Sequence, residues 1–209
     1  MSETPIVIAI DGTAASGKGT LARRLAAHLG YACLDTGLLY RAVAYSLLSR
    51  NIPAEDKEAA IAAARNLDPA MLDNPELRSG AAGRGASVVA AVAEVRQALL
   101  DFQRQFPAAS GKPGAILDGR DIGTVIFPDA KAKFFVDADQ EVRTRRRLNE
   151  LLAKGEDVTF ESVLSDMKTR DARDAGRPDA PMKKAEDAIL IDTTILDADQ
   201  AFQKALNSL

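Results

Sequence analysis

The chain has 209 residues, of which 46% are hydrophobic and 27% are charged, and these proportions are ordinary for a soluble globular protein. A formal net charge of −3 argues against a nucleic-acid-binding surface, and no apolar run approaches the length of a membrane helix. A single cysteine excludes an internal disulfide and fits a reducing compartment, and residues 1–10 show no signal-peptide pattern, so we expect a cytoplasmic protein.

The first expected element is a buried strand at residues 6–10, because five consecutive apolar residues, four of them β-branched, suit a strand covered on both faces. The glycine-rich loop that follows can turn its N–H groups inward, in front of a helix N-terminus. Gly, four residues and Gly-Lys is the spacing of a P-loop, and a chance glycine loop is the alternative. We therefore assign the binding of nucleotide phosphates to Gly12, Thr13, Ala14, Ala15, Ser16, Gly17, Lys18, Gly19 and Thr20.

One position of this loop departs from many P-loops. Gly19 stands where Ser or Thr is common, and the hydroxyl comes one place later, at Thr20. Direct metal ligation by the loop is therefore less secure, and no residue is assigned as a metal ligand. A magnesium ion would be held mostly through water and phosphate.

A leucine every four residues predicts a helix over 21–29 that packs on the sheet. A second short strand is expected at 31–34, followed by a helix through Ser49 that Thr36 caps. The start of this helix would lie at the C-terminal end of a strand, where open α/β sheets bind ligands. The candidate residues there are Thr36, Tyr40 and Arg41.

Residues 50–82 are alanine-rich and interrupted by prolines, which predicts short helices in a peripheral lobe. The glycine-containing segment 83–87 is expected to be a flexible turn before a helix at about 88–106. Arg96 lies one residue off the apolar face of that helix, and taken alone it is best interpreted as a solvated arginine.

A third strand, 114–118, ends in Asp118, which suits the second nucleotide-site strand of P-loop proteins, whose carboxylate orders magnesium or its waters. The Gly-Arg-Asp turn at 119–121 is better explained as a ligand loop than as a connector. A fourth strand is expected at 132–136 and a helix at about 140–153. Most of the arginines of this helix, at 143, 145, 146 and 147, are interpreted as a solvated face.

Another helix leads into the arginine-rich segment 170–178, where three arginines at i, i+3 and i+7 share one side and are offset by two aspartates. A surface ion-pair lattice is one interpretation, and a lid that closes over phosphate is the other. A fifth strand at 188–192 and a last helix complete the chain. Strands that alternate with helices predict a parallel sheet with helices on both faces, and no linker divides the chain.

Taken together, six motifs resemble the bacterial cytidylate kinases, of the nucleoside-monophosphate kinase group of P-loop proteins. The motifs span nearly the whole chain: Ile-Asp-Gly-x4-Gly-Lys-Gly-Thr at 10–20, Leu-Asp-Thr-Gly-x2-Tyr-Arg at 34–41, Ala-Ser-x-Val at 86–89, Val-Arg-x-Ala-Leu at 95–99, Asp-Gly-Arg-Asp-Ile-Gly-Thr-Val-x-Phe-Pro at 118–128 and Arg-Asp-x-Arg-Asp at 170–174. The resemblance implies a single α/β domain, 1–209, with the three-layer P-loop fold and a five-stranded parallel sheet. It also implies a helical monophosphate-binding insert at 36–106 and a small helical lid at 154–177.

The resemblance further implies ATP-dependent phosphorylation of CMP and dCMP to the diphosphates, with Mg²⁺, by a monomer that has no nucleic-acid or membrane partner. The acceptor phosphate would meet Arg41, Arg120 and Arg177, the sugar Ser87, Arg170 and Asp174, and the cytosine Thr36, Arg96 and Asp121, with Tyr40 also in the substrate site. The residues implied in catalysis are Lys18, Arg120, Arg173 and Arg177. The family more often has serine at the position of Thr36.

Elementary chemistry supports the base assignment. Asp121 can accept from the amino group of cytosine, and Arg96 can donate to its ring acceptors. Uracil places a carbonyl where cytosine has its amino group, and a buried unpaired carboxylate costs about 1–3 kcal/mol. The alternatives are a kinase of shikimate or of another nucleotide, a nucleotide switch, for which no Asn-Lys-x-Asp segment is present, and a nucleic-acid-binding module.

Overall fold

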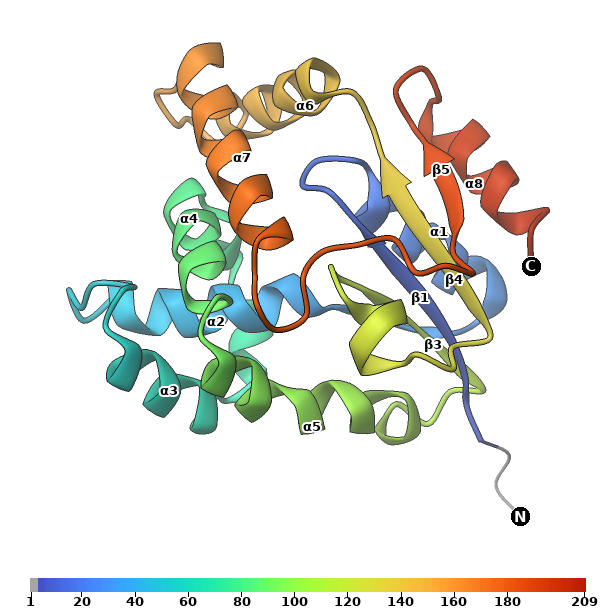
Figure 1. Ribbon diagram of the computed structural model, residues 1–209, viewed down its shortest axis with the longest axis horizontal. Helices are drawn as coiled ribbons and strands as arrows, with labels where there is room; N and C mark the ends of the chain where they lie inside the picture. Colours follow the sequence, from blue (N-terminus) through green and yellow to red (C-terminus); the bar gives the residue numbers. More distant parts are fainter. Residues whose placement is uncertain (1–3) are drawn as a thin grey trace.

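The computed structural model describes residues 4–209, which form a five-stranded, all-parallel sheet with helices on both faces (Figure 1). The strands are β1 (Ile6–Gly12), β2 (Ala32–Asp35), β3 (Gly114–Asp118), β4 (Ala132–Asp137) and β5 (Ile189–Asp192), in the spatial order β2-β3-β1-β4-β5. The predicted α/β class and all five predicted strands are confirmed, with strand ends shifted by no more than two residues.

The helices are α1 (Lys18–Leu29), α2 (Thr36–Leu48), α3 (Lys57–Arg65), α4 (Gly80–Val89), α5 (Ala93–Ala109), α6 (Gln140–Leu152), α7 (Phe160–Ala175) and α8 (Ala198–Leu206). Two 3₁₀ turns, η1 (Pro69–Asp73) and η2 (Pro75–Arg78), and one π-helical turn, η3 (Ile122–Ile126), complete the elements. The central strand β1 is buried on both faces, as its apolar run predicts. Ile8 and Ile10 face α1 and α8, whereas Ala9 faces α5 and η3.

Helices α2, α3, α4 and α5 pack around a second apolar core beside the sheet, built on Leu39, Leu47 and Leu99 (Figure 1). Here the expected turn at 83–87 is wrong, because these residues belong to α4. Ser79 caps α4 by accepting from the N–H of Ala82. A Cβ on Gly85 would lie 2.9 Å from the Cβ of Ala44, so this glycine serves the close approach of α4 to α2 rather than a turn.

Two other local expectations also fail. The long helix expected from 88 breaks at Val92, which has an extended backbone with φ −84° and ψ 116° and precedes α5. Thr36 does not cap α2 through its side chain, since its hydroxyl instead donates to the carbonyl oxygen of Asp118 over 2.8 Å. The extended backbone of Val92 interrupts the predicted helix, and the contact with Asp118 replaces the predicted cap of Thr36.

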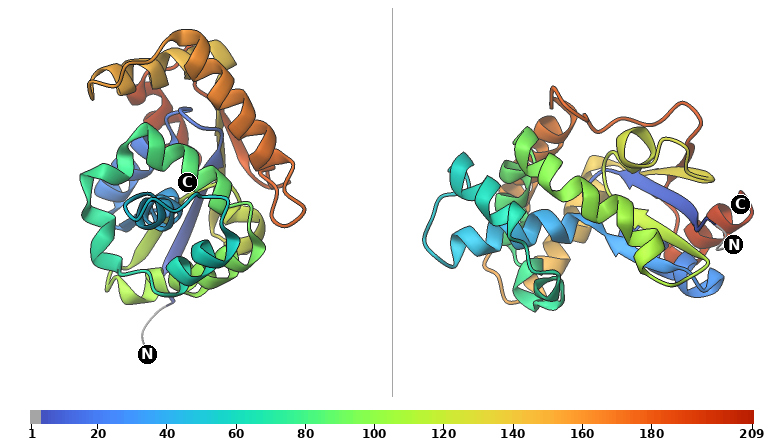
Figure 2. Two further views of the ribbon diagram at one scale, coloured as in Figure 1. Left: turned by 90° about the vertical axis from the view of Figure 1, so that its left-hand side faces the viewer. Right: turned by 90° about the horizontal axis from the view of Figure 1, so that it is seen from below.

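The α6–α7 hairpin lies at the edge of the sheet where the strands end (Figure 1). Leu151, Val163 and Met167 of this hairpin pack against Ala14 of the P-loop in a small core of their own. Figure 2, left, shows α7 running down past the sheet, and α7 also contacts α4. The P-loop therefore lies between the end of β1 and the α6–α7 hairpin.

Candidate active site

The P-loop, residues 12–17, joins β1 to α1. Gly12 has φ 143°, and a Cβ at this position would lie 1.9 Å from the Val136 carbonyl oxygen, so a side chain has no room. Gly17 caps α1 in the left-handed conformation, with φ 91°, and the first turn of α1 carries no acidic side chain. The N–H groups and the positive end of α1 therefore favour an anion in front of the loop.

Lys18, the first residue of α1, and Asp118, the last residue of β3, face each other beside this anion site. The Lys18 ammonium lies 3.7 Å from Asp118 Oδ1 and donates to the Thr13 carbonyl oxygen over 3.3 Å. Burial, together with the charge of Arg120, lowers the pKa of Lys18 to about 8. Burial raises the pKa of Asp118 to about 6, against the effect of Lys18. A phosphate beside Lys18 would add the negative charge that favours the ammonium form.

A cleft of about 420 Å³ opens in front of the P-loop. We call it the phosphate cleft, because cationic side chains line it. Burial and the charge of Arg120 lower the pKa of Arg170 to about 9, and burial and Arg147 lower that of Arg41 to about 10. So many cations in one buried place call for a ligand with several negative charges. The side chains that give the cleft its charge are Lys18, Arg23, Asp35, Arg41, Arg78, Asp118, Arg120, Arg146, Arg147, Glu150 and Arg170.

A second, tighter cavity of about 40 Å³ adjoins the cleft. It brings together nine of the ten residues that the sequence assigns to the substrate: Thr36, Tyr40, Ser87, Arg96, Arg120, Asp121, Arg170, Asp174 and Arg177. The tenth, Arg41, lines the larger cleft and donates to the Leu77 carbonyl oxygen over 2.8 Å. Their contacts with a nucleotide remain a prediction.

Asp174 forms ion pairs with three arginines of the tighter cavity. Its Oδ2 lies 3.0 Å from Arg120 Nε and 3.8 Å from Arg170 Nε, and its Oδ1 accepts from Arg177. Burial raises the pKa of this carboxyl, but the charges of Arg120, Arg170 and Arg177 outweigh it and hold the pKa below its usual value. The carboxylate is therefore fixed as an anion that orients three guanidinium groups.

Arg96 is buried, so the solvated interpretation of this residue is wrong. Its guanidinium donates to Asp121 and lies 3.5 Å from the hydroxyl of Tyr40. Burial raises the pKa of Asp121 despite the opposing charge of Arg96. The two charged groups thus form a paired donor and acceptor edge at one end of the tighter cavity.

Arg173 stands apart from the other predicted catalytic residues. It donates to the Ser87 hydroxyl over 3.0 Å and lines a separate cavity of about 210 Å³ between α4 and α7. In this arrangement Arg173 joins the α6–α7 hairpin to α4 and does not line the phosphate cleft.

The interpretation of the α6 arginines as mostly solvated is wrong for three of the four. Arg145 is exposed and pairs with Glu141, but Arg143 is buried and Arg146 and Arg147 line the phosphate cleft. Spacings of three and four residues place these three on the same side of α6, which is the signal that could have identified them.

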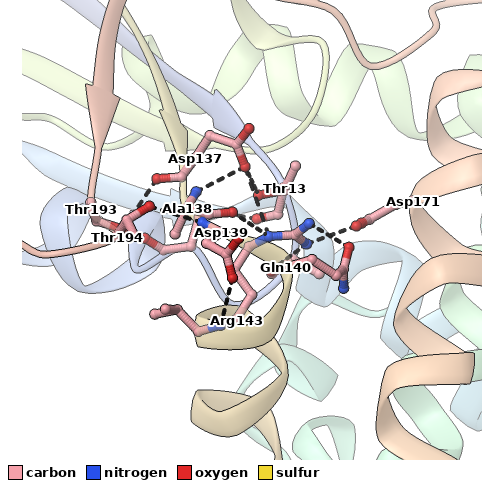
Figure 3. Close-up of polar contacts among 12 residues, drawn as sticks. Thr13, Asp137, Ala138, Asp139, Gln140, Arg143, Asp171, Thr193 and Thr194 are labelled. Atoms are coloured by element: carbon pink, nitrogen blue, oxygen red, sulfur yellow. Dashed lines mark hydrogen bonds and ion pairs between the residues drawn. The ribbon is translucent and has the colours of Figure 1, made fainter.

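Arg143 is the centre of a polar network that Figure 3 shows. It donates to the carbonyl oxygens of Ala138 and Ala14 over 2.9 and 3.3 Å, and to Asp171 Oδ2 over 2.7 Å. Asp137 lies 3.8 Å from Arg143 Nε and accepts from the Thr13 hydroxyl over 2.6 Å (Figure 3). The network therefore joins the P-loop, the end of β4 and α7.

A further cavity of about 320 Å³ lies on the other side of the P-loop, between Gly17 and the segment that joins β5 to α8. Arg146 reaches it and donates to the Thr193 hydroxyl over 3.0 Å, and Thr193 donates to the Ser16 carbonyl oxygen over 2.8 Å. Sequence reasoning did not identify Thr193, because its role depends on a partner 177 residues away.

Across residues 4–209, no helix is both long and apolar enough to span a membrane. Nor do three or more His, Cys, Asp or Glu side chains of these residues gather as a potential metal site.

Solved structures share the arrangement of elements. An uncharacterised protein of Eubacterium ventriosum has a TM-score of 0.57 at 17% identity, with 97% of each chain covered. A sugar kinase of Janibacter gives 0.51 at 16% identity, covering 97% of this chain and 93% of that chain, and a shikimate kinase of Bacteroides thetaiotaomicron gives 0.50 at 13%, covering 98% and 99%. At these identities the likeness concerns the fold alone. The sheet, the glycine loop and the arginine-lined cleft in front of it make the chain a P-loop kinase.

The sequence model of the cytidylate kinase family matches residues 8–209. Cytidylate kinases of Rhodospirillum rubrum and Xanthobacter autotrophicus are 55% and 57% identical, covering 98% and 96% of this chain and 97% and 95% of theirs. That of Caulobacter vibrioides is 55% identical, covering 95% of this chain and 92% of its own. The chain belongs to the cytidylate kinase family, and the resemblance inferred from its motifs is confirmed.

Proposed function

We propose that the enzyme transfers the γ-phosphoryl group of ATP to CMP and dCMP, giving the diphosphates, with Mg²⁺ as the divalent ion. The observation that carries the proposal is that the cleft and the tighter cavity share two cationic side chains. Arg120 and Arg170 line both spaces. Two anions held from opposite sides of these guanidinium groups would be brought together with their repulsion neutralised.

The donor would occupy the P-loop side. The loop N–H groups and Lys18 would hold its β- and γ-phosphates, as in P-loop kinases. The neighbouring cavity beside Gly17, with Arg146 and Thr193 in its wall, has room for the adenine. A guanidinium of this kind can stack on an aromatic base.

The acceptor would occupy the tighter cavity. Buried polar atoms without a hydrogen-bond partner in residues 4–209 include Nε of Arg170 and Nε of Arg177. Both side chains line this tighter cavity, which we call the acceptor cavity. An oxygen-rich ligand there would satisfy donors that the protein leaves unpaired. Asp121 and Arg96 would read the amino group and the ring acceptors of cytosine. These contacts with base and phosphate are common to CMP and dCMP.

The residues near Lys18 suit magnesium. Asp35, Asp118 and Thr20 line the cleft and offer only oxygen donors, the ligand type that this ion prefers. With two carboxylates at hand, the ion would complete its shell with phosphate oxygens and water. When bound, it would neutralise charge on the donor phosphates.

The reaction needs no general base from the protein, because the attacking phosphate oxygen of the acceptor is already anionic. The one histidine, His28, is exposed on α1 and lines none of the cavities described above. We propose segment 36–106 as the monophosphate-binding insert and 154–177 as the lid. Closure of the lid would exclude water from the phosphoryl group. We further propose that the enzyme is a monomer.

The test is a coupled assay with ATP and magnesium and with CMP, dCMP, UMP, AMP and shikimate as acceptors. We expect turnover with CMP and dCMP, and a kcat/KM for UMP lower by about tenfold or more, since Asp121 would face a carbonyl oxygen. Transfer to shikimate, equal use of UMP, or nucleotide binding without turnover would contradict the proposal.

A further inference from the structure

Asp11, next to last in β1, is a buried carboxylate with no direct place in either cavity of the candidate site. It is 4% exposed and lines neither the phosphate cleft nor the acceptor cavity. Its Oδ1 accepts from the N–H of Ile122 and its Oδ2 from the N–H of Gly123, each over 2.8 Å. Both partners belong to η3, which directly follows the Arg120–Asp121 turn.

These two bonds do the work of a helix cap. The first N–H groups of a helical turn have no partner within it, and an aspartate at the preceding position commonly accepts from them. Asp121 holds that position for η3, but its side chain makes no cap hydrogen bond. It is paired with Arg96 at the acceptor cavity instead. Asp11 accepts in its place, from a strand 111 residues away in sequence.

The carboxylate of Asp11 is anchored by the sheet. Asp11 is opposite Phe135 in the pairing of β1 with β4, and the next residue, Gly12, is opposite Val136 in the same pairing. The turn is tied to the same strand a second time, because the N–H of Gly119 donates to the Ile10 carbonyl oxygen over 2.9 Å. The acceptor turn and the P-loop are thus fixed to consecutive residues of one strand.

Burial raises the pKa of Asp11 to about 7, against the lowering effect of the Gly123 and Ile122 N–H groups. Burying a carboxylate is costly, and a serine or threonine hydroxyl would avoid that cost if only one N–H group had to be capped. Two acceptor oxygens on one short side chain are what two successive N–H groups require.

We propose that Asp11 is a positioning residue for recognition of the acceptor base. By capping η3 in place of Asp121, it leaves the Asp121 carboxylate at the acceptor cavity and sets the Arg120–Asp121 turn at a fixed distance from the P-loop. The inference rests on the proposed reading of cytosine by Asp121 and Arg96, and its test separates the two.

Asp11→Asn keeps the volume of the side chain but offers one acceptor, while its NH₂ group faces the other N–H. Asp121 then gains a competing role as the cap of its own helical turn. We expect the KM for CMP to rise about tenfold and the CMP-over-UMP ratio of kcat/KM to fall, since one buried donor loses its partner. The KM for ATP is expected to change less than about twofold, because the P-loop N–H groups are not involved.

Asp137→Asn is the matched comparison, since Asp137 ends the neighbouring strand β4 and accepts from Thr13 of the P-loop. It should raise the KM for ATP more than that for CMP. Asp121→Ala, measured alongside, tests the base reading itself. The double variant Asp11→Asn/Asp121→Ala should show the CMP-over-UMP ratio of Asp121→Ala alone, because Asp11 acts through Asp121.

An unchanged CMP-over-UMP ratio in Asp11→Asn, or equal rises of the KM for ATP and CMP, would overturn the inference while Asp121→Ala still lowers the ratio. If Asp121→Ala leaves the ratio unchanged, the base-reading part of the proposed function fails, and the inference fails with it. Thermal melting shows whether each variant is folded. Asp11→Ser, which replaces the two carboxylate oxygens with one shorter hydroxyl and leaves space for water, provides the same comparison if Asp11→Asn does not fold.

Discussion

The guanidinium of Arg143 and the carboxylate of Asp171 form an ion pair, with Nη1 and Oδ2 separated by 2.7 Å, that joins α6 to α7 beside the P-loop (Figure 3). The same guanidinium nitrogen donates to the Ala14 carbonyl oxygen. Asp171 is the immediate neighbour of Arg170 and lies one helical turn before Asp174. The contacts of Arg143 with Ala14 and Asp171 thus tie α7, which carries Arg170 and Asp174, to the P-loop.

We expect Arg143→Lys to weaken this link without removing the charge. An ammonium group cannot reproduce the planar fork that meets several acceptors at once, so stability should fall by about 1–3 kcal/mol. With α7 less firmly placed, phosphoryl transfer to CMP should slow about tenfold, while ATP hydrolysis without CMP becomes a larger fraction of turnover. The measurement is the ratio of ATP hydrolysis without acceptor to kinase turnover.

Arg145→Lys is the control, because Arg145 lies on the same helix but is exposed and pairs with Glu141. Its other contact, a cation–π contact 5.5 Å from the centre of the Phe160 ring, is one that a lysine can also make. It should leave both rates and the melting temperature near those of the parent protein. If Arg143→Lys lowers the melting temperature but not the coupling ratio, then the ion pair only stabilises the fold.

Much of the fold could be predicted because its signals are local. The apolar run of residues 6–10 and the glycine spacing that follows determine a buried strand and a P-loop within a few residues. The strands at 114–118 and 132–136 were found in the same way. The helical conformation of segment 83–87 could not be predicted, because its glycines are needed for close packing against α2. The local sequence does not reveal that neighbour.

The site residues could also be predicted where their signals are local in the sequence, and not where they depend on distant partners. Residues that cluster in motifs, such as Arg120 and Asp121, could be grouped from the sequence, and the structure places them around one cavity. The partners of Arg143 and Asp11 could not be identified in this way, because they lie 28 and 111 residues away. A buried aspartate at the end of an apolar strand gives no sign, by itself, of which N–H groups it will meet.

Lys18→Ala should lower kcat by at least about a hundredfold, the usual loss when a charge placed against the transition state is removed. The protein should stay folded, since the substitution also removes the cost of burying an ammonium group. Steady-state kinetics and a thermal melt are the measurements, with Lys131→Ala, at an exposed lysine, as the control. Near-normal turnover in Lys18→Ala would refute the assignment of the P-loop.

The pH dependence of kcat/KM for ATP should report Lys18 of the free enzyme. Because burial lowers the pKa of this ammonium to about 8, it loses its proton, and its attraction for phosphate, as the pH rises through that value. We therefore expect kcat/KM to be level near pH 7 and to fall by about tenfold for each unit well above 8. Lys18→Arg keeps its charge throughout and should lose this alkaline decline, even if it is slower. An alkaline decline that persists in Lys18→Arg would place the titrating group elsewhere.

Arg177→Ala tests whether the arginines around Asp174 bind the acceptor or only hold the fold together. Asp174 would keep its contacts with Arg120 and Arg170, so the carboxylate would not be left unpaired and the protein should fold. Loss of a charge-assisted contact with the acceptor phosphate should lower kcat/KM for CMP by about tenfold to a hundredfold, with the KM for ATP little changed.

Arg84→Ala is the matched control for Arg177→Ala, since Arg84 is an exposed arginine of α4 that makes only a 3.5 Å ion pair with Asp166 of α7. It should leave kcat/KM for CMP unchanged. The second measurement is the melting temperature with and without CMP. If Arg177→Ala lowers the melting temperature by the same amount in both conditions and kcat/KM for CMP is preserved, the arginine face of α7 is a structural ion-pair lattice. A selective loss of the stabilisation by CMP, because Asp174 and its remaining arginines hold α7 in place, would assign Arg177 to the acceptor site.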